Sequence, residues 1–451
     1  DMFGLPRGGD TPLRQRFELD DCRLVRVDRD AWALYHDFRL LHLLVQQHDL
    51  PQLSISFTTK APLSRPGLEP AWAGRLLGEL NRFANAFDPD NRDSWPPARA
   101  ILTGLLAARN GSVAHDAAAI GHAHIDTAWL WPLEETTRKC VRTFSNVLGL
   151  MDRYPRLKFA CSQAYQYTVM KQTQPELYER IRARAQEGRW IHVGGAWVEP
   201  DCNIPSGESL LRQALYGQHF FEREFGSRSR LFWAPDIFGY PAQLPQILRH
   251  TGFDRFLTQK LSWNAFNQPL HHTFVWRGLD GSEVLTHFPP ADTYNARCTP
   301  EELRYHEANY KDADRSSDAI YLFGWGDGGG GPDDDMLEAL DRLEDLQGMP
   351  RVTVRTPDEL FDRLESLGPT LHTLSGELYF ELHRGTLTTQ ARTKRLNRLA
   401  EHALAELELL AAHRTITDDD PPSRADLERL WTTVCLHQFH DDLPGSSITP
   451  V

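Results

Sequence analysis

The sequence has few cysteines, no long hydrophobic run and no excess of positive charge, and each absence excludes a class of protein. Six cysteines are scattered along 451 residues without a Cys-x-x-Cys pair. This excludes a disulfide framework and favours reduced thiols in a cytoplasmic protein. No apolar stretch reaches the length of a membrane-spanning helix, and the net charge of −13 argues against nucleic acid or a membrane as a partner. The sequence leaves open whether the chain forms a homo-oligomer.

The middle of the chain alternates between strand and helix patterns. Its composition, 41% hydrophobic and 25% charged, is that of a globular protein, and its length predicts two or three domains. Seven apolar runs predict strands at Ala117–Gly121, Leu157–Cys161, Trp190–Gly194, Arg230–Ala234, Arg255–Thr258, Glu283–Phe288 and Ala319–Phe323. Helical patterns between them cover Leu133–Tyr154, Gln174–Glu187, Gly207–Phe225, Ala242–Thr251, Pro300–Asn309 and Asp334–Leu346. We expect an α/β fold with a parallel sheet or barrel over residues 116–375, and functional residues where the strands end.

The two ends of the chain carry helical patterns without strand patterns between them. Residues 1–115 predict a helical lead-in, and residues 376–451 predict part of a helical bundle. The predicted helices of these ends are Trp32–His48, Pro70–Phe87, Thr388–His413 and Ser423–His437. The expected catalytic domain therefore lies between two helical parts.

The segment after the first predicted strand carries the strongest chemical signal. His124 and Asp126 are two residues apart, so at a frayed strand end both side chains can face one point. Imidazole nitrogen and carboxylate oxygen are ligands of divalent metal ions, zinc among them. Trp129 would place a flat apolar surface beside the metal, which suggests a sugar or another polar ring as substrate. His122 is the alternative metal ligand.

Carboxylates also follow the third and fourth predicted strands. Asp236 lies between aromatic residues at the end of the fourth strand, where a carboxylate can serve as metal ligand and nucleophile. Glu199 and Asp201 follow a glycine pair after the third strand and suit hydrogen bonds to sugar hydroxyls. The alternative interpretation is that Glu199 and Asp201 are solvated loop charges.

The seventh strand and the last predicted helix end in further polar residues. Asp327 follows the seventh strand and precedes Gly328–Gly331, where glycines allow a close approach of the backbone. A phosphate-binding loop is the alternative there, but the segment lacks the Lys-Ser/Thr of a P-loop. At the end of the last helix, residues 437–442 offer a second imidazole and more carboxylates.

Together these segments resemble the family 38 α-mannosidases, in particular the cytosolic, vacuolar and bacterial subgroup. The similarity covers roughly residues 115–450 and rests on the blocks GHAHIDTAWLWPLEET, GGAWVEPDCNIPSGES, WAPDIFGYPAQLPQIL, FLTQKLSWN, HFPPADTYN, GWGDGGGGP, ELHRGTLTTQARTKRLNR and HQFHDDLPGSS. The resemblance implies a seven-stranded α/β barrel followed by a helical bundle, and one zinc ion per chain. It also implies hydrolysis of terminal α-linked mannose from oligosaccharides or glycans, with retention of configuration.

The resemblance assigns a role to each motif residue. Zinc would be held by His124, Asp126, Asp236 and His440, and Asp236 would also be the nucleophile. Asp327 would be the general acid, although the Golgi and lysosomal members have two adjacent aspartates where this chain has Asp327-Gly328. The substrate would contact Trp129, Phe238, Asp441, Glu199 and Asp201.

Two other functions compete with this hypothesis. One is a metal-dependent carbohydrate deacetylase, whose His-x-x-x-His motif near an early aspartate this chain lacks. The other is a non-catalytic sugar-binding fragment that keeps the metal. Large β domains follow the bundle in the family, so we also expect this chain to be a fragment or a product of truncation, with low activity.

Overall fold

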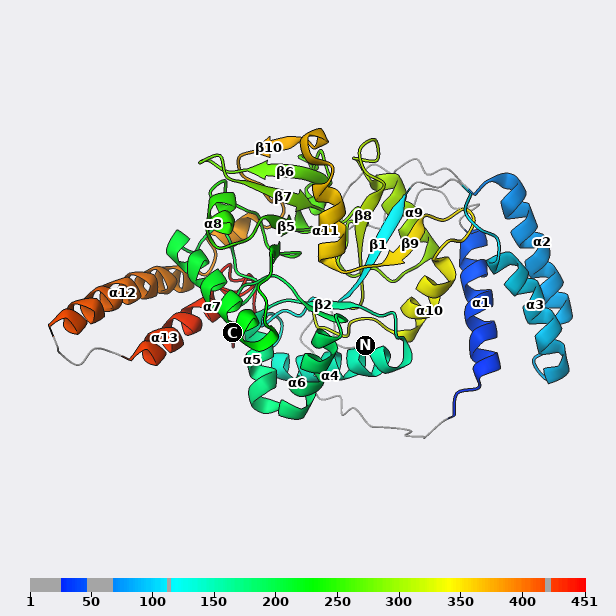
Figure 1. Cartoon of the computed structure of the whole chain (residues 1–451), viewed down its shortest axis with the longest axis horizontal. Helices are drawn as coiled ribbons and strands as arrows, with labels where there is room; N and C mark the ends of the chain where they lie inside the picture. Colours follow the sequence, from blue (N-terminus) through cyan, green and yellow to red (C-terminus); the bar gives the residue numbers. More distant parts are fainter. Residues whose placement is uncertain (1–25, 47–67, 112–114, 418–422) are drawn as a thin grey trace.

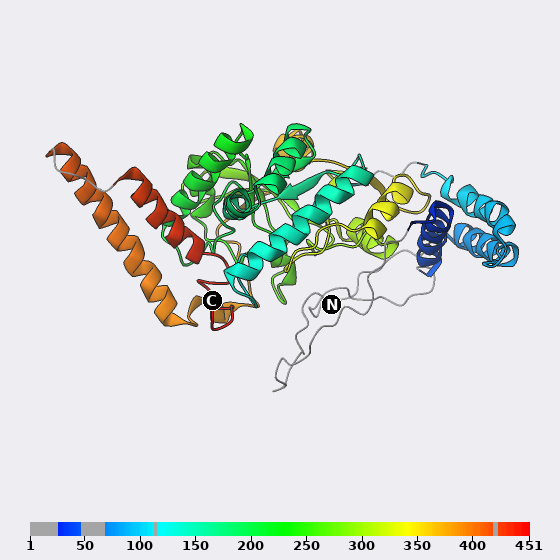
Figure 2. The same cartoon turned by 90° about the horizontal axis from the view of Figure 1, so that it is seen from below.

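The chain folds into a central α/β body with helices projecting at both ends (Figure 1). The structure is a computed structural model, and it describes residues 26–46, 68–111, 115–417 and 423–451. Helices α1 to α3 lie at one end and helices α12 and α13 at the other, as a second view also shows (Figure 2). None of the described helices is long and apolar enough to cross a membrane.

The described strands form two five-stranded sheets. The first has the order β3-β2-β1-β8, with β9 also paired to β1, and all of its pairs are parallel. Its strands are β1 (Asp116–His122), β2 (Phe159–Cys161), β3 (Trp190–His192), β8 (Asp318–Phe323) and β9 (Arg351–Val354). The second has the order β10-β6-β7-β5-β4 and one antiparallel pair, β6 with β7. Its strands are β4 (Leu231–Trp233), β5 (Arg255–Leu257), β6 (Thr273–Arg277), β7 (Glu283–His287) and β10 (Thr373–Ser375).

All seven expected strands are present, but they do not form one continuous hydrogen-bonded ring. The ladder is interrupted between β3 and β4 and again between β7 and β8. A single backbone hydrogen bond, from Gly194 N to Leu231 O at 3.1 Å, joins the first pair. At the second interruption the Ile320 N–H donates to the His287 side chain at 3.0 Å. We call this second place the β7–β8 seam.

The two sheets nevertheless share one apolar core. Side chains of β1, β4, β5 and β8 belong to the same buried cluster, which includes Ala118, Ile120, Leu231, Trp233, Leu257, Ile320 and Leu322. Burial of such side chains contributes about 25 cal/mol per Å² of apolar surface. This shared core holds the carboxyl ends of both sets of strands near each other.

Helices cover the outside of the sheets. The expected helices are present as α4 (Leu133–Arg153), α6 (Pro175–Gln186), α7 (Gly207–Phe225), α8 (Leu244–His250), α9 (Pro300–Asn309) and α10 (Asp334–Leu343). Helix α9 begins as predicted because Thr299 and Glu302 form a capping box. Helices α3 (Trp95–Leu106), α5 (Ala164–Thr173) and α11 (Pro357–Glu365), together with strands β6, β9 and β10, were not expected.

The four helices predicted at the two ends of the chain are present in its described parts. The lead-in contains α1 (Arg29–Gln46), α2 (Pro70–Ala86) and α3 (Trp95–Leu106). The other end contains α12 (Ala391–Ile416) and α13 (Arg424–His437). Cys22 and the last two residues of the predicted helix Trp32–His48 lie outside the described residues.

Candidate metal centre

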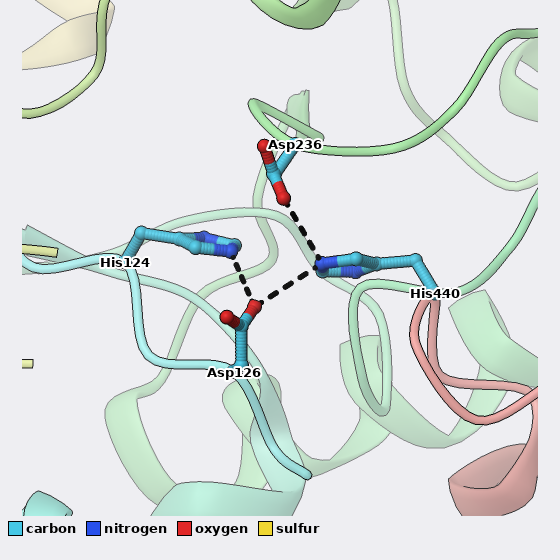
Figure 3. Close-up of side chains that lie close together, drawn as sticks. All are labelled: His124, Asp126, Asp236 and His440. Atoms are coloured by element: carbon cyan, nitrogen blue, oxygen red, sulfur yellow. Dashed lines mark hydrogen bonds and ion pairs between the residues drawn. The ribbon is translucent and has the colours of Figure 1, made fainter. Parts of the chain in front are cut away.

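Four side chains from three separate parts of the chain converge at the carboxyl ends of the strands (Figure 3). His124 and Asp126 follow β1, Asp236 follows β4, and His440 follows α13. Each offers one ligand atom, and these atoms all lie within 4.8 Å of one another. All four residues are buried. The cluster thus joins residues of the α/β body to a residue of the helical bundle.

The contacts within the cluster centre on the carboxylate of Asp126. Its Oδ1 atom lies 2.8 Å from His124 Nε2 and 3.3 Å from His440 Nε2. His440 Nε2 also lies 3.7 Å from Asp236 Oδ2. That nitrogen is buried without a hydrogen-bond partner. A metal ion that displaced its proton could coordinate it.

Glu199 orients both imidazole rings. The His440 Nδ1–H group donates to the backbone carbonyl of Glu199 at 2.9 Å. His124 Nδ1 lies 3.3 Å from the Glu199 carboxylate. Because each Nδ1 faces an acceptor, each Nε2 atom is directed into the cluster as a ligand. Two imidazole nitrogens and two carboxylates are a donor set that fits a divalent transition-metal ion.

The electrostatics of the cluster also favour a bound cation. Burial lowers the pKa of His124, but Glu199 and Asp126 outweigh burial and raise it to about 10. His440 behaves in the same way, because its contacts with Asp126 and Asp441 raise its pKa to about 9. Without a metal ion the buried carboxylates therefore keep both imidazoles protonated. A divalent ion would replace these protons.

Of the two candidate histidines after β1, His124 lies in the cluster and His122 lies behind it. The His122 ring is 6.4 Å from the His124 ring, between centroids. His122 Nε2 accepts a hydrogen bond from the Trp233 indole at 3.2 Å. Burial lowers the pKa of His122 to about 3, so this ring is neutral and packs in the interior.

Asp236 presents one oxygen to the cluster and the other to two donors. Its Oδ1 atom accepts from the Lys260 ammonium at 2.5 Å and from the Tyr294 hydroxyl at 2.8 Å. Lys260 itself is buried and lies 4.0 Å from the centroid of the Trp263 ring. This leaves Asp236 Oδ2 free to face His440 and a metal ion.

Tyr294 links Asp236 to Asp327. Its hydroxyl lies 2.8 Å from Asp236 Oδ1 and 2.9 Å from Asp327 Oδ1, so these two oxygens are at most about 5.7 Å apart. Burial, with the nearby charges of Asp126 and Asp236, raises the pKa of Asp327. A raised pKa favours a carboxyl group that holds a proton. Asp327 also has a left-handed backbone, with φ of 57°, which turns the chain at the end of β8.

The remaining predicted residues lie at different places around the cluster. Phe238 is buried, and its ring centroid is 5.8 Å from that of His440. Asp441 Oδ2 lies 3.9 Å from His440 Nε2, and burial raises the pKa of Asp441 to about 8. Trp129 is half-buried and contacts Trp131 edge-on at 5.8 Å between ring centroids.

Glu199 and Asp201 are not solvated loop charges, because each is 2% exposed. Glu199 contacts His124, as described above, and also accepts from Ser162 Oγ at 2.5 Å. The Asp201 carboxylate instead accepts the backbone N–H groups of Asn203 and Ile204, at 2.9 and 2.7 Å. Asp201 thus shapes its own loop.

Sequence reasoning missed Lys260 and Tyr294. Both lie in the recognised blocks FLTQKLSWN and HFPPADTYN, after strands β5 and β7. Their position after a strand was the available signal, but neither residue type is a common metal ligand. Their function depends on contacts that only the fold brings together.

Comparison with known proteins identifies the family. The profile of the glycosyl hydrolases family 38 N-terminal domain matches residues 114–377, and that of the alpha mannosidase middle domain matches residues 381–451. The chain belongs to glycosyl hydrolase family 38. A further 17 curated proteins are similar to it at a significant level, among them mannosidases from animals, fungi and a slime mould.

Three of these relatives are closely similar. The chain is 52% identical to alpha-mannosidase G of Dictyostelium discoideum over 73% of its own length and 30% of that protein. It is 48% identical to human alpha-mannosidase 2C1 over 84% of its length and 36% of that protein. It is 40% identical to alpha-mannosidase of Saccharomyces cerevisiae over its whole length and 42% of that protein. The chain thus spans less than half the length of these relatives.

Among solved structures, an alpha-mannosidase from Enterococcus faecalis V583 has a similar fold. The TM-score is 0.64 at 20% sequence identity, over 74% of this chain and 39% of that one. At this identity the similarity concerns the fold alone.

Proposed function

We propose that this chain is the catalytic part of a zinc-dependent, retaining α-mannosidase. The proposal combines family membership with the alpha-mannosidase names of the relatives. The observation that carries the mechanism is the pair of carboxylates, Asp236 and Asp327, that share the Tyr294 hydroxyl beside the metal cluster. The proposed substrate is a terminal α-linked mannose of an oligosaccharide or glycan, and the proposed location is the cytoplasm.

The separation of these carboxylates supports retention of configuration. Retaining glycosidases hold their two carboxyl groups about 5–5.5 Å apart, whereas inverting enzymes need about 6.5–9.5 Å to admit a water molecule. The oxygens of Asp236 and Asp327 that share Tyr294 are at most about 5.7 Å apart. This spacing favours direct attack by a carboxylate.

In the first proposed step, a carboxylate oxygen of Asp236 forms a bond to the anomeric carbon while the bond to the leaving oxygen breaks. Asp327, whose pKa is raised, gives its proton to that oxygen. In the second step Asp327 takes a proton from water, the water oxygen bonds to the anomeric carbon, and Asp236 is released as a carboxylate. The sugar thus keeps its configuration.

The proposed zinc ligands are His124, Asp126, Asp236 and His440. When bound, zinc supplies a Lewis acid that can hold sugar hydroxyls and neutralise the buried carboxylates. Lys260 and Tyr294 hold the other oxygen of Asp236, which fixes the orientation of its carboxylate. We assign Trp129 and Phe238 to the walls of the sugar site, and Asp441 to the binding of substrate hydroxyls.

We also propose the division of the chain into a lead-in (1–115), a catalytic domain (116–375) and the start of a bundle (376–451). The ranges matched by the two family profiles, 114–377 and 381–451, support the last two of these parts. The seven strands would form the barrel of the family. Its ladder would be interrupted at two places, each bridged by one hydrogen bond.

The test of the proposed function is hydrolysis of an aryl α-mannoside by the purified chain and by a version extended to the full length of the relatives. We expect turnover that is lost on chelation and restored by zinc. Time-resolved NMR should show the α-anomer as first product, and a slow fluorinated mannoside should label Asp236. A β-anomer as first product would contradict the retaining route.

The same assay separates the alternatives. A carbohydrate deacetylase would release acetate from an N-acetylated sugar and leave the mannoside intact. A sugar-binding fragment would bind mannose without turnover, so Asp236→Asn would abolish no activity.

A further inference from the structure

We propose that Glu401, on the helix α12 of the bundle, is a positioning residue for the metal centre. This inference rests on the proposed metal centre. It concerns how His440, the one proposed ligand outside the α/β body, is held in place. Glu401 does not contact the metal ligands. It acts through Gln438, two residues before His440.

Glu401 is a buried carboxylate with partners on three elements. It is 4% exposed, and its Oε1 atom accepts from Ser206 N at 2.8 Å, Ser209 Oγ at 2.7 Å and Gln438 Nε2 at 3.1 Å. Its Oε2 atom pairs with Arg398. Ser206 and Ser209 begin helix α7, where a negative charge is favourable. Burying a carboxylate is costly unless it is satisfied in this way, so the site is built around this residue.

Gln438 transmits the position of α12 to the metal centre. Its side-chain NH₂ group donates to Glu401 and also to Asn397 Oδ1 at 2.9 Å, one helical turn earlier. Its backbone carbonyl accepts from Asp201 N at 2.8 Å. Gln438 is fully buried. Both its side chain and its backbone are therefore fixed.

The fixed Gln438 joins the two segments that hold His440. The Asp201 N–H group binds the Gln438 carbonyl, while the His440 N–H group binds the Glu199 carbonyl at 3.3 Å. The Glu199 carbonyl also accepts from His440 Nδ1. These bonds place residues 199–201 and 438–440 side by side, so a shift of Gln438 would move the His440 ring.

A second glutamate on α12 provides a matched control. Glu408 lies two helical turns after Glu401 and also joins α12 to α7 and α13. It accepts from Arg212 Nη2 at 2.8 Å and from the Trp431 indole at 2.9 Å. These contacts do not include Gln438. A loss of helix docking in general should therefore affect Glu401 and Glu408 variants alike.

The experiment compares Glu401→Leu, Glu401→Gln and Glu408→Leu in the full chain. Zinc affinity is measured by competition with a chromophoric chelator, and stability by urea unfolding of the metal-free protein. We expect Glu401→Leu to weaken zinc binding about 10–100-fold, the range for residues that orient metal ligands. Glu401→Gln keeps an acceptor oxygen and should weaken zinc binding less than Glu401→Leu does. Glu408→Leu should leave zinc affinity unchanged.

Hydrogen exchange of the metal-free protein gives a second measurement. Glu401→Leu should speed exchange at the Asp201 and His440 amides, and Glu408→Leu should not. Absence of zinc binding by the wild type would contradict the proposed function, yet the exchange data would still test the role of Glu401. If Glu401→Leu fails to fold, Gln438→Met should reproduce the loss of affinity. Equal effects of Glu401→Leu and Glu408→Leu, or no effect of Gln438→Met, would overturn the proposal.

Discussion

The metal centre and the β7–β8 seam both bury histidines, but with opposite consequences for charge. In the metal centre, His124 and His440 face carboxylates, and their pKa values rise to about 10 and 9. At the seam, burial lowers the pKa of His115 to about 4 and that of His287 to about 3. Burial alone therefore does not decide the protonation of a histidine. The charge of its partner does.

Three histidines lie at the seam: His115, His287 and His306. Two of them bind the backbone of β8 on the side where it pairs with no described strand. Strand β8 pairs with β1 on one side, and on its other side the Ile320 backbone has no strand partner among the described residues. The Ile320 carbonyl accepts from His306 Nε2–H, and its N–H group donates to His287 Nε2, both at 3.0 Å. His306 Nδ1 in turn lies 3.0 Å from His115 Nε2. The bond from the Ile320 N–H group requires an unprotonated His287 Nε2 atom, and the bond to the Ile320 carbonyl requires a proton on His306 Nε2.

The largest expected effect breaks the metal centre. His124→Ala removes a ligand, and because even residues that only orient ligands change metal affinity about 10–100-fold, we expect a loss of at least about 100-fold, with turnover lost in parallel. Metal content and aryl mannoside turnover measure this. His122→Ala is the control, since His122 lies behind the cluster and should keep the metal. Full metal content in His124→Ala would instead point to His122 as the ligand.

The next largest effect breaks the seam. His306→Leu leaves the Ile320 carbonyl and the His115 ring without partners, and each unsatisfied buried group costs about 1–3 kcal/mol. We expect the free energy of unfolding to fall by about 3 kcal/mol in urea titrations of the metal-free protein. His402→Ala, on the exposed side of α12, should change it by less than about 0.5 kcal/mol. Equal values for the two variants would show that the seam does not depend on His306.

The two regions should also respond to pH in opposite directions. At the seam, His115 and His287 have lower pKa values in the folded protein than in the unfolded chain. Their contribution to stability is therefore present above about pH 6.5. It is lost as the pH falls toward 4 for His115 and toward 3 for His287. The raised pKa values of His124 and His440 give the metal-free centre the opposite sign, because its contribution is lost as the pH rises toward 9 and 10.

Urea unfolding of the metal-free protein between pH 4 and 10 measures both arms. The charged neighbours of the seam are Asp116, paired with Arg355, and Asp318, paired with Arg363. His115→Gln should flatten the acid arm, by an amount on the order of 2–3 kcal/mol near pH 4, and leave the alkaline arm unchanged. An unchanged acid arm in this variant would mean that His115 is already protonated in the folded protein.

Sequence patterns predicted the elements whose signals are local. Helix α9 has a capping box, and β1 contains the apolar run Ala117–Ile120, so both were found with nearly correct bounds. Helix α5 was missed because its sequence, AYQYTVMKQT, is rich in aromatic and β-branched residues, and tertiary packing overrides that preference. Strands β6 and β10 were missed because they are defined by their pairing with each other and with β7.

For the candidate site, the motifs named the four residues that the fold brings together, since metal ligands are recognisable residue types. Lys260, Tyr294 and Glu401 could not be found in this way. Lys260 reaches the site from a short 3-10 helix and Tyr294 from a loop, whereas Glu401 lies on α12 and acts only through Gln438. Their importance depends on distances that spacing along the chain does not encode.

The smallest expected effect concerns the Tyr294 hydroxyl, which binds both Asp236 and Asp327. Tyr294→Phe removes the hydrogen bonds to Asp236 and Asp327 but keeps the ring. The hydroxyl lowers the pKa of Asp327, so its loss should raise that pKa further. We expect kcat to fall about 10-fold, equivalent to about 1.4 kcal/mol, and the alkaline limb of the kcat/KM profile to move to higher pH, because Asp327 would hold its proton longer.

Tyr240→Phe is the matched control for this change. Tyr240 is also a buried tyrosine near the end of β4, but its hydroxyl donates to the Ala234 carbonyl and contacts Thr258 rather than the carboxylates. It should lower stability by about 1 kcal/mol and leave the pH profile in place. Zinc affinity should fall less in Tyr294→Phe than in His124→Ala, because Lys260 still binds the Asp236 oxygen that faces away from His440. A fall in zinc affinity as large as that of His124→Ala would mean that Tyr294 holds the metal ligand in place, and that its contact with Asp327 is incidental.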